Sequence, residues 1–128
     1  MSLIPEELRY SEDHEWVRSG NGNSVRVGIT NHAATELGDI VYVSLPTVGE
    51  EVAAGDTCGE LESTKSVSDV LAPVSGVVIS VNEILANAPE TVNVDPYGDG
   101  WLFDIELSAD ADLDDLLDAD AYAELVGE

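Results

Sequence analysis

One lysine stands alone in this sequence, and its surroundings suit a reactive position. Lys65 is the only lysine among 128 residues. Apolar and polar residues alternate through Glu60–Ser63 and again through Ser66–Val70, a period typical of two β-strands. Thr64 and Lys65 fall between these strands, at the tip of the predicted hairpin. A primary amine on a flexible stem at such a tip is accessible to an acylating enzyme. The sequence therefore predicts a modification site at Lys65, against the alternative of an ordinary exposed lysine.

Two other groups of residues could do chemistry. Cys58 with His14 or His32 would form a nucleophile–base pair. No nucleophile signature surrounds Cys58, which falls in a predicted strand, so a small core residue is the favoured interpretation. A dense acidic run could bind a cation, but it lacks the EF-hand spacing with its central Gly and terminal Glu. Its carboxylates belong to Asp110, Asp112, Asp114 and Asp115.

The charge of the chain limits its function. There are 27 acidic residues against 4 Lys and Arg, a formal net charge of −23 at pH 7. Phosphate backbones and anionic lipids repel such a chain, so we expect no nucleic-acid or membrane partner. Self-repulsion favours a monomer, with partners that carry basic docking surfaces. Adaptation to a salty cytoplasm is an alternative that one sequence leaves open.

Length and cysteine content agree with an intracellular domain. A chain of 128 residues suits a single domain, here expected to span 1–128. No stretch approaches the roughly 20 apolar residues of a membrane span. Met1 to Tyr10 shows no basic segment followed by an apolar one, so no secretory signal is expected. A lone cysteine permits a reducing compartment, and the cytoplasm is the default.

Short β-branched runs between turn residues predict a mainly β fold with a core over about 15–107. The expected strands are Glu15–Ser19, Ser24–Gly28, Ile40–Ser44, Glu51–Ala53, Thr57–Ser63, Ser66–Leu71, Gly76–Val81 and Trp101–Glu106. A short helix is predicted at Asn31–Leu37, between the N-cap Thr30 and the terminating Gly38. A second, acidic helix is predicted at about Leu113–Leu125, and Asn87–Gly100 is interpreted as a turn-rich connection without regular structure. Many short strands indicate a small barrel or sandwich.

Several motifs together resemble one known family. The segment Glu60 to Asp69, followed by Ala72-Pro73-Val74-Ser75-Gly76, is similar to the attachment segment of lipoylated carrier domains. Other segments resemble the H protein family of the glycine cleavage system in the family's order. They are Tyr10-Ser-Glu-Asp-His14-Glu15-Trp16-Val17, Val27-Gly28-Ile29-Thr30, Leu37-Gly38-Asp39-Ile40-Val41-Tyr42-Val43-Ser44-Leu45-Pro46 and Val92-Asn93-Val94-Asp95-Pro96-Tyr97-Gly98-Asp99-Gly100-Trp101-Leu102. The resemblance runs from about Leu8 to Tyr122.

The resemblance implies a fold, a cofactor and a non-catalytic role. The fold is the barrel-sandwich hybrid of lipoyl domains, with a short internal helix and a C-terminal helix. Lipoate is joined in amide linkage to Lys65, and Glu62 and Gly76 serve recognition of the attachment motif. The chain would be a carrier that catalyses no step itself.

The resemblance also implies partners. A pyridoxal-phosphate glycine decarboxylase (the P protein) passes an aminomethyl group to the lipoyl arm. A folate-dependent aminomethyltransferase (the T protein) takes it over, and dihydrolipoamide dehydrogenase (the L protein) collects the electrons. A lipoate ligase or lipoyl transferase attaches the arm.

Three side chains match family positions that line a cleft for the loaded arm. They are Glu15, His32 and Asp69, four residues after the lysine. Carboxylates there would favour the cationic amine at the end of the arm. The alternatives are ordinary: Glu15 and Asp69 as surface acids, and His32 on the solvent side of its helix.

Related carriers are the main competing interpretation. A biotinyl carrier shares the hairpin lysine but has methionines beside it, whereas Thr64 and Ser66 flank Lys65 here. A lipoyl domain of a 2-oxoacid dehydrogenase would be shorter and would lack the His14-Glu15-Trp16 segment. A role in relaying lipoate to other proteins stays open.

Overall fold

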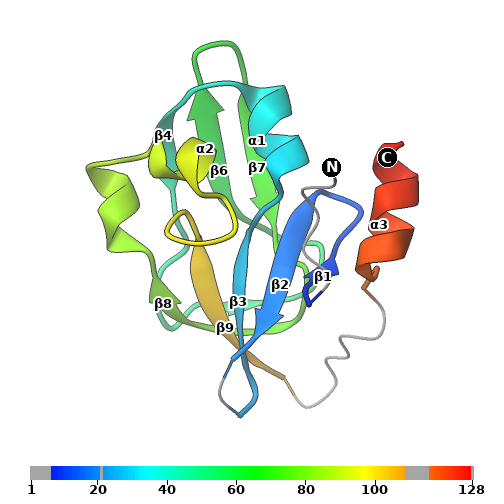
Figure 1. Ribbon diagram of the computed structural model, residues 1–128. Coiled ribbons are helices and arrows are strands. Elements are labelled where there is room, and N and C mark those ends of the chain that lie inside the picture. Colours follow the sequence, from blue (N-terminus) through cyan, green and yellow to red (C-terminus); the bar gives the residue numbers. More distant parts are fainter. Residues whose placement is uncertain (1–6, 21, 109–115, 128) are drawn as a thin grey trace.

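The secondary structure is mainly β in a computed structural model that describes residues 7–20, 22–108 and 116–127 (Figure 1). The strands are β1 (Arg9–Tyr10), β2 (Glu15–Ser19), β3 (Ser24–Ile29), β4 (Ile40–Ser44), β5 (Glu51–Val52), β6 (Thr57–Ser63), β7 (Val67–Leu71), β8 (Gly76–Val81) and β9 (Phe103–Leu107). The helices are α1 (Asn31–Leu37), α2 (Thr91–Val94), α3 (Ala119–Val126) and the 3-10 helix η1 (Glu83–Ala86). No helix in the described ranges has the length and hydropathy that a membrane span requires.

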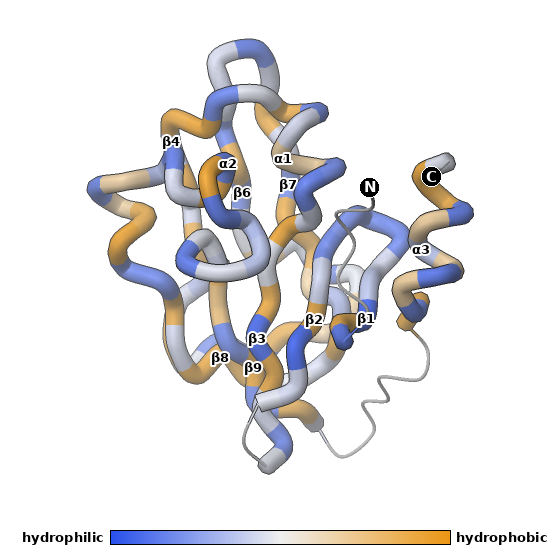
Figure 2. Tube along the Cα trace, in the orientation of Figure 1, coloured by the Kyte–Doolittle hydropathy of each residue, from blue (hydrophilic) through white to orange (hydrophobic). Residues whose placement is uncertain are grey.

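Two antiparallel sheets enclose the core. One has six strands in the order β1-β2-β3-β9-β8-β5, and the other has three in the order β4-β6-β7. Hydrophobic residues lie along the strands of both sheets (Figure 2). The fully buried side chains of Val27, Val78, Phe103 and Ile105 from the larger sheet join one cluster with Leu61 from the smaller. The predicted mainly β fold, with a short internal helix and a C-terminal helix, is confirmed.

Helix α1 has the predicted bounds and both predicted caps. The Thr30 hydroxyl accepts a hydrogen bond from the Ala33 amide at 3.2 Å, which satisfies one free donor of the first turn. Gly38 ends the helix with φ of 83°, a backbone conformation that favours glycine, and its N–H donates to the Ala34 carbonyl at 3.1 Å. The helix therefore stops at Leu37, and Gly38 begins the short loop that leads into β4.

The C-terminal helix begins later than predicted. The expected helix covered about 113–125, of which residues 113–115 lie outside the described residues. Leu117 exchanges two backbone hydrogen bonds with Tyr10, at 2.8 and 2.7 Å, and so forms a β-bridge instead of a helical turn. Asp118 then caps α3 through its Oδ1, which accepts from the Ala121 amide at 2.8 Å. Pairing with β1 outweighs the helical pattern at this point.

The connection at 87–100 is more regular than predicted. It contains α2, a four-residue helix between Pro89 and Pro96, and η1 precedes it. A helix this short has no readable hydrophobic period. Strand β1, with two residues, was missed for the same reason. The remaining strands match the predicted bounds or differ by one or two residues at an end.

A second hydrophobic cluster attaches α3 to the N-terminal strands. Leu8, Tyr10, Trp16, Ala119 and Tyr122 are its buried members. The Tyr10 and Tyr122 rings stack with centroids 4.7 Å apart. The Tyr122 hydroxyl lies 2.8 Å from His14 Nδ1 and 2.7 Å from the Thr30 hydroxyl. One phenol thus joins α3, the β1–β2 turn and the start of α1.

We expect Tyr122→Phe to lower the free energy of unfolding by about 1–2 kcal/mol, because it removes a buried hydroxyl and two hydrogen bonds while the ring packing stays. Urea unfolding measures the loss. Tyr42→Phe is the matched control, since Tyr42 is 58% exposed. Equal changes in the two variants would contradict a special role for the Tyr122 hydroxyl.

Candidate functional site

Lys65 stands at an exposed turn whose backbone is held from within. Ser63 Oγ accepts hydrogen bonds from the backbone amides of Lys65, at 3.2 Å, and Ser66, at 3.0 Å. The Ser63 amide donates to the Ser66 carbonyl at 2.8 Å, which closes the turn between β6 and β7. Thr64 and Lys65 are both exposed, and the turn between β6 and β7 lies at the top of the molecule as drawn in Figure 1. The predicted position of Lys65 at a hairpin tip is confirmed.

The loop after α1 forms a shelf against this turn, made of Gly38, Asp39 and Ile40. The Asp39 carbonyl accepts from the Thr64 amide at 3.1 Å. A Cβ on Gly38 would lie 3.3 Å from Lys65 Cε, so the stem of the lysine runs close past this glycine. Gly38 therefore serves both the end of α1, through its positive φ, and the path of the Lys65 side chain.

Asn93 of α2 holds the shelf in place through two side-chain hydrogen bonds. Its Oδ1 accepts from the Ile40 amide at 2.8 Å, and its Nδ2 donates to the Gly38 carbonyl at 2.8 Å. One side-chain amide thus satisfies a donor and an acceptor on either side of Asp39. Asn93 was not predicted from the sequence, because it lies in the segment that was interpreted as irregular. The sequence signal that could have identified Asn93 is its amide side chain, which can both donate and accept hydrogen bonds, within a segment that resembles the H protein family.

Glu15 is buried, which makes the surface-acid alternative for this residue wrong. It is 2% exposed. Its Oε1 accepts from the Ser11 hydroxyl at 3.3 Å and its Oε2 from the Leu71 amide at 2.8 Å. Burial raises the pKa of Glu15 to about 8, although the Leu71 and Ser11 hydrogen bonds act in the opposite direction. The carboxyl joins β2 of the larger sheet to β7 of the smaller.

The other two predicted cleft residues, His32 and Asp69, are connected to Glu15 indirectly, through residues that adjoin or bind it. His32, in the first turn of α1, has its ring 4.8 Å from that of His14, the residue before Glu15. Its Nε2 is 3.6 Å from Glu36 Oε1, and a third of its side chain is exposed. Burial, and secondly the neighbouring His32, lower the pKa of His14. Asp69 is exposed on β7, two residues before the Leu71 amide that binds Glu15.

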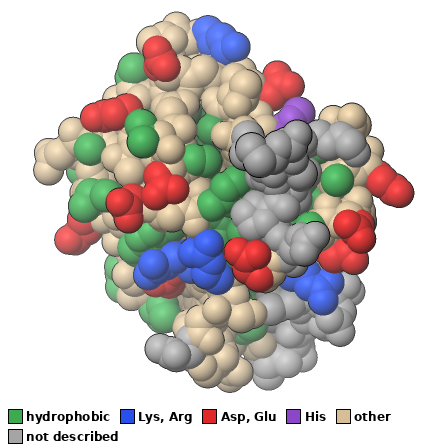
Figure 3. Space-filling model, viewed as in Figure 1, with side chains coloured by type: hydrophobic (Ala, Val, Ile, Leu, Met, Phe, Trp, Pro, Cys, Tyr) green, Lys and Arg blue, Asp and Glu red, His purple; other side chains and the backbone are tan. Residues whose placement is uncertain are grey.

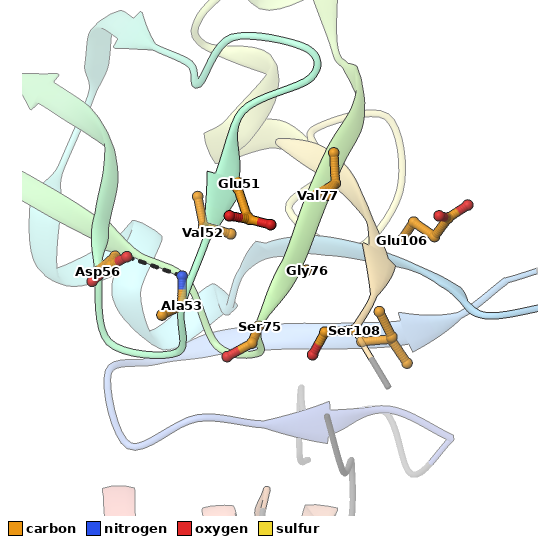
Figure 4. A pocket seen from close by; sticks show the side chains of 10 residues that line it. Glu51, Val52, Ala53, Asp56, Ser75, Gly76, Val77, Glu106 and Ser108 are labelled. Carbon is orange, nitrogen blue, oxygen red and sulfur yellow. Dashed lines mark hydrogen bonds between the residues drawn. The ribbon is translucent and has the colours of Figure 1, made fainter. Parts of the chain in front are cut away.

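The two predicted recognition residues lie at opposite ends of the hairpin. Glu62 is exposed on β6, three residues before Lys65. Gly76 begins β8, after the turn that follows β7, and lines a cavity of about 500 Å³ with Glu51 and Glu106 (Figure 4). A Cβ on Gly76 would overlap the Glu106 carbonyl oxygen and lie 2.6 Å from Ile105 Cγ2. The close pairing of β8 and β9 thus favours glycine at position 76 for packing, independently of any recognition role.

The alternative sites gain no support. Cys58 is buried, its thiol donates to the Val70 carbonyl at 3.4 Å, and burial raises its pKa to about 12. Such a thiol supplies no thiolate near neutrality. The acidic run at Asp110, Asp112, Asp114 and Asp115 lies outside the described residues. Within the described part of the chain, no group of three or more His, Cys, Asp or Glu is arranged to hold a metal ion.

Comparison with known proteins gives one consistent result. Residues 8–128 match the model of the family described as Glycine cleavage H-protein. A glycine cleavage system H protein from Nocardia farcinica is 54% identical over 131 residues, covering 99% of each chain. One from Pseudoalteromonas translucida is 51% identical over 128 residues, covering 100% of this chain and 99% of that protein. The crystal structure of a glycine cleavage system H protein from Mycobacterium marinum superposes with a TM-score of 0.88 at 46% identity, covering 98% of this chain and 100% of the other.

The buried Glu15 predicts a pH dependence of stability. Its folded pKa, about 8, lies above the ordinary value of 4.5, so the folded chain holds a proton that the unfolded chain releases between these values. The contribution of this bound proton to the free energy of unfolding is complete below about pH 4.5 and is lost as the pH rises through about 8. We expect the free energy of unfolding to fall more between about pH 5 and about pH 9 in the wild type than in Glu15→Gln. Urea unfolding at both pH values tests this. The exposed Glu60→Gln is the control, and parallel pH profiles of the wild type and Glu15→Gln would contradict the prediction.

The shelf contacts predict a local effect of Asn93→Ala. Loss of both hydrogen bonds should speed amide hydrogen exchange at Ile40 and Thr64 by roughly tenfold or more, because about 1.4 kcal/mol of local opening energy corresponds to a factor of ten. Asn82→Ala is the matched control, since the Asn82 amide donates to two backbone carbonyls, of Asp99 and Trp101. The idea fails if both variants speed exchange at Thr64 equally.

Proposed function

The chain belongs to the glycine cleavage H-protein family, and from this premise we propose that Lys65 is the residue that carries its lipoyl group. The chain is the H protein of the glycine cleavage system, the lipoyl-bearing carrier, and it is not a catalyst. The family as a whole carries lipoate, and such a system implies partner enzymes.

The observation that supports Lys65 most strongly is its exposed place on a fixed turn. It is the only lysine of the chain. The residues present fit an amide-linked arm, because the lysine stem passes Gly38, which has no side chain to obstruct it. Thr64 and Ser66 beside it also leave the amine accessible, and both are exposed. When bound, lipoate supplies a redox-active disulfide that accepts an aminomethyl group as it is reduced.

We propose that the loaded arm rests along α1, toward Glu15, His32 and Asp69. Gly38 and His32 are separated by six positions, which at about 1.5 Å per residue of helix is about 9 Å. Helix α1 thus offers a short path from the lysine to His32. His32 is one-third exposed on α1 and Asp69 is exposed on β7, whereas Glu15 is buried with its carboxyl bridging the two sheets. These side chains would hold the cationic end of the arm.

Partner enzymes would meet an acidic surface. On the face shown in Figure 3, acidic side chains are spread over many elements. We propose that the partners are a pyridoxal-phosphate glycine decarboxylase, a folate-dependent aminomethyltransferase and dihydrolipoamide dehydrogenase, which act on the same arm in turn. Tethering gives each of them a high effective concentration of the reacting group. Basic docking surfaces on these enzymes would make association sensitive to salt.

For the attachment motif we propose two different roles. Glu62, exposed three residues before Lys65, is available for direct contact with a lipoate ligase or lipoyl transferase. Gly76 acts indirectly, because it lets β8 approach β9 closely where the chain leaves the hairpin. Recognition by the ligase would then depend on Gly76 only through the shape of the hairpin.

Intact mass spectrometry after incubation with a lipoate–protein ligase, lipoate and ATP tests the assignment. We expect one added lipoyl group on the wild type and none on Lys65→Arg, because arginine offers no acylatable amine. Circular dichroism should show the same fold for both proteins. Since Lys65 is the only lysine, any lipoyl group on the variant would contradict the proposal directly. So would an unmodified wild type beside a known lipoyl domain that is modified in the same tube.

A further inference from the structure

The outer face of the three-stranded sheet carries an unusual row of side chains next to Lys65. Tyr42 of β4, Glu62 of β6 and Val67 of β7 stand opposite one another in register. Residues that stand opposite each other point to the same side of a sheet. Tyr42 is 58% exposed and Val67 is 56% exposed. The row is separated from Lys65 only by the turn residues, so two large apolar groups lie beside the lysine with a carboxylate between them.

The neighbouring positions extend this surface. Val41, at an irregularity in the β4–β6 register, is 52% exposed. The next row along the sheet is polar, with Ser44, Glu60 and Asp69 in register. Glu60 and Asp69 are both exposed. We call the surface made by Val41, Tyr42, Glu62 and Val67, with Glu60 and Asp69 behind them, the hairpin face.

The hairpin face lies on strands whose opposite side is buried in the core. Val43, Leu61 and Val70 point to the opposite side of the same strands and are at most 8% exposed. Single exposed apolar residues are ordinary, but contiguous ones mark interaction sites. Tyrosine in particular is common among residues that dominate binding energy at interfaces. The face thus combines a firm base, exposed apolar groups on both sides of Glu62, and fixed negative charge.

We propose that the hairpin face is the docking surface for the enzyme that acylates Lys65; this rests on the proposed function of Lys65. The short distance between the reacting amine and the turn identifies the partner. Acylation occurs at the lysine amine, one side-chain length from the turn, so the active site of that enzyme must come to the turn itself and cover the strands beside it. Enzymes that act on the far end of the arm meet the reacting group away from the turn and need not cover this face.

Charge complementarity defines the chemistry of the partner surface. Three carboxylates, of Glu60, Glu62 and Asp69, lie on the hairpin face of a chain with formal net charge −23. The complementary surface carries Arg or Lys opposite these groups and apolar side chains opposite Tyr42 and Val67. In the reaction itself, the Lys65 amine, after losing a proton, bonds to the acyl carbon, and the bond from that carbon to the AMP leaving group of the activated acid breaks.

Steady-state acylation by a lipoate–protein ligase tests the docking surface. The variant carries Tyr42→Thr and Val67→Thr together, which keeps residues suited to strands while removing most of the apolar surface. We expect KM for the unmodified carrier to rise tenfold or more while kcat stays within twofold, because docking is lost and Lys65 is untouched. Ile79→Thr is the matched control, since Ile79 is 42% exposed but belongs to β8 of the other sheet, and its KM should stay unchanged.

Two further measurements keep the outcomes distinct. A binding assay with Lys65→Arg, with and without the paired Tyr42 and Val67 substitutions, should show the same tenfold loss of ligase affinity without any reaction. Fully lipoylated carrier bearing the paired substitutions should be oxidised and reduced by dihydrolipoamide dehydrogenase at the wild-type rate. An unchanged KM, an equal rise in Ile79→Thr, or an equal loss with the dehydrogenase would each overturn the proposal. Failure of the wild type to be acylated at all would instead overturn the function of Lys65.

Discussion

The presentation of Lys65 depends on the hydrogen bonds that hold the β6–β7 turn against the shelf after α1. An exposed turn with unpaired backbone groups moves freely, whereas this one is closed by Ser63 and fastened to Asp39 through the Thr64 amide. Asn93 fixes the shelf in turn, from a helix that lies more than fifty positions further along the chain. The amine of Lys65 is mobile on its own stem, but the point from which it swings is fixed to the core. A carrier that must meet different enzymes needs both properties.

Electrostatics divides the molecule into a solvated acidic exterior and one buried carboxyl. Exposed carboxylates such as Glu60 and Asp69 are in contact with water, so their electrostatic interactions are screened by salt. Glu15 is different, because burial outweighs its two hydrogen bonds and raises its pKa to about 8. Near neutrality it is largely protonated, so the surroundings of the proposed resting place are less negative than the sequence suggests. A cationic group arriving there would favour the ionised form of Glu15 and so strengthen its own binding.

Local signals in the sequence predicted much of this fold. The bounds of α1, β2, β4, β6 and β8 agree with the prediction, because Gly, Pro, Asn or Thr marks one or both ends of each. The hairpin tip at Lys65 was likewise predicted from alternation alone. The start of α3 was predicted wrongly, since the pairing of Leu117 with Tyr10 depends on a contact between distant segments. The same holds for the candidate site: neither the burial of Glu15 nor the two bonds of Asn93 can be inferred from neighbouring residues. The role of Lys65 stays a prediction.

The contact of Tyr122 with His14 has a consequence for the order in which the protein matures. These residues are 108 positions apart, and the cluster around Tyr10 and Trp16 closes only when both segments are present. During synthesis the β6–β7 hairpin emerges from the ribosome well before Tyr122 does. A nascent chain therefore offers the lysine turn early, while the packing of His14 beside Glu15 waits for the last helix. The turn that bears Lys65 and the packing around His14 are thus completed at different moments of biosynthesis.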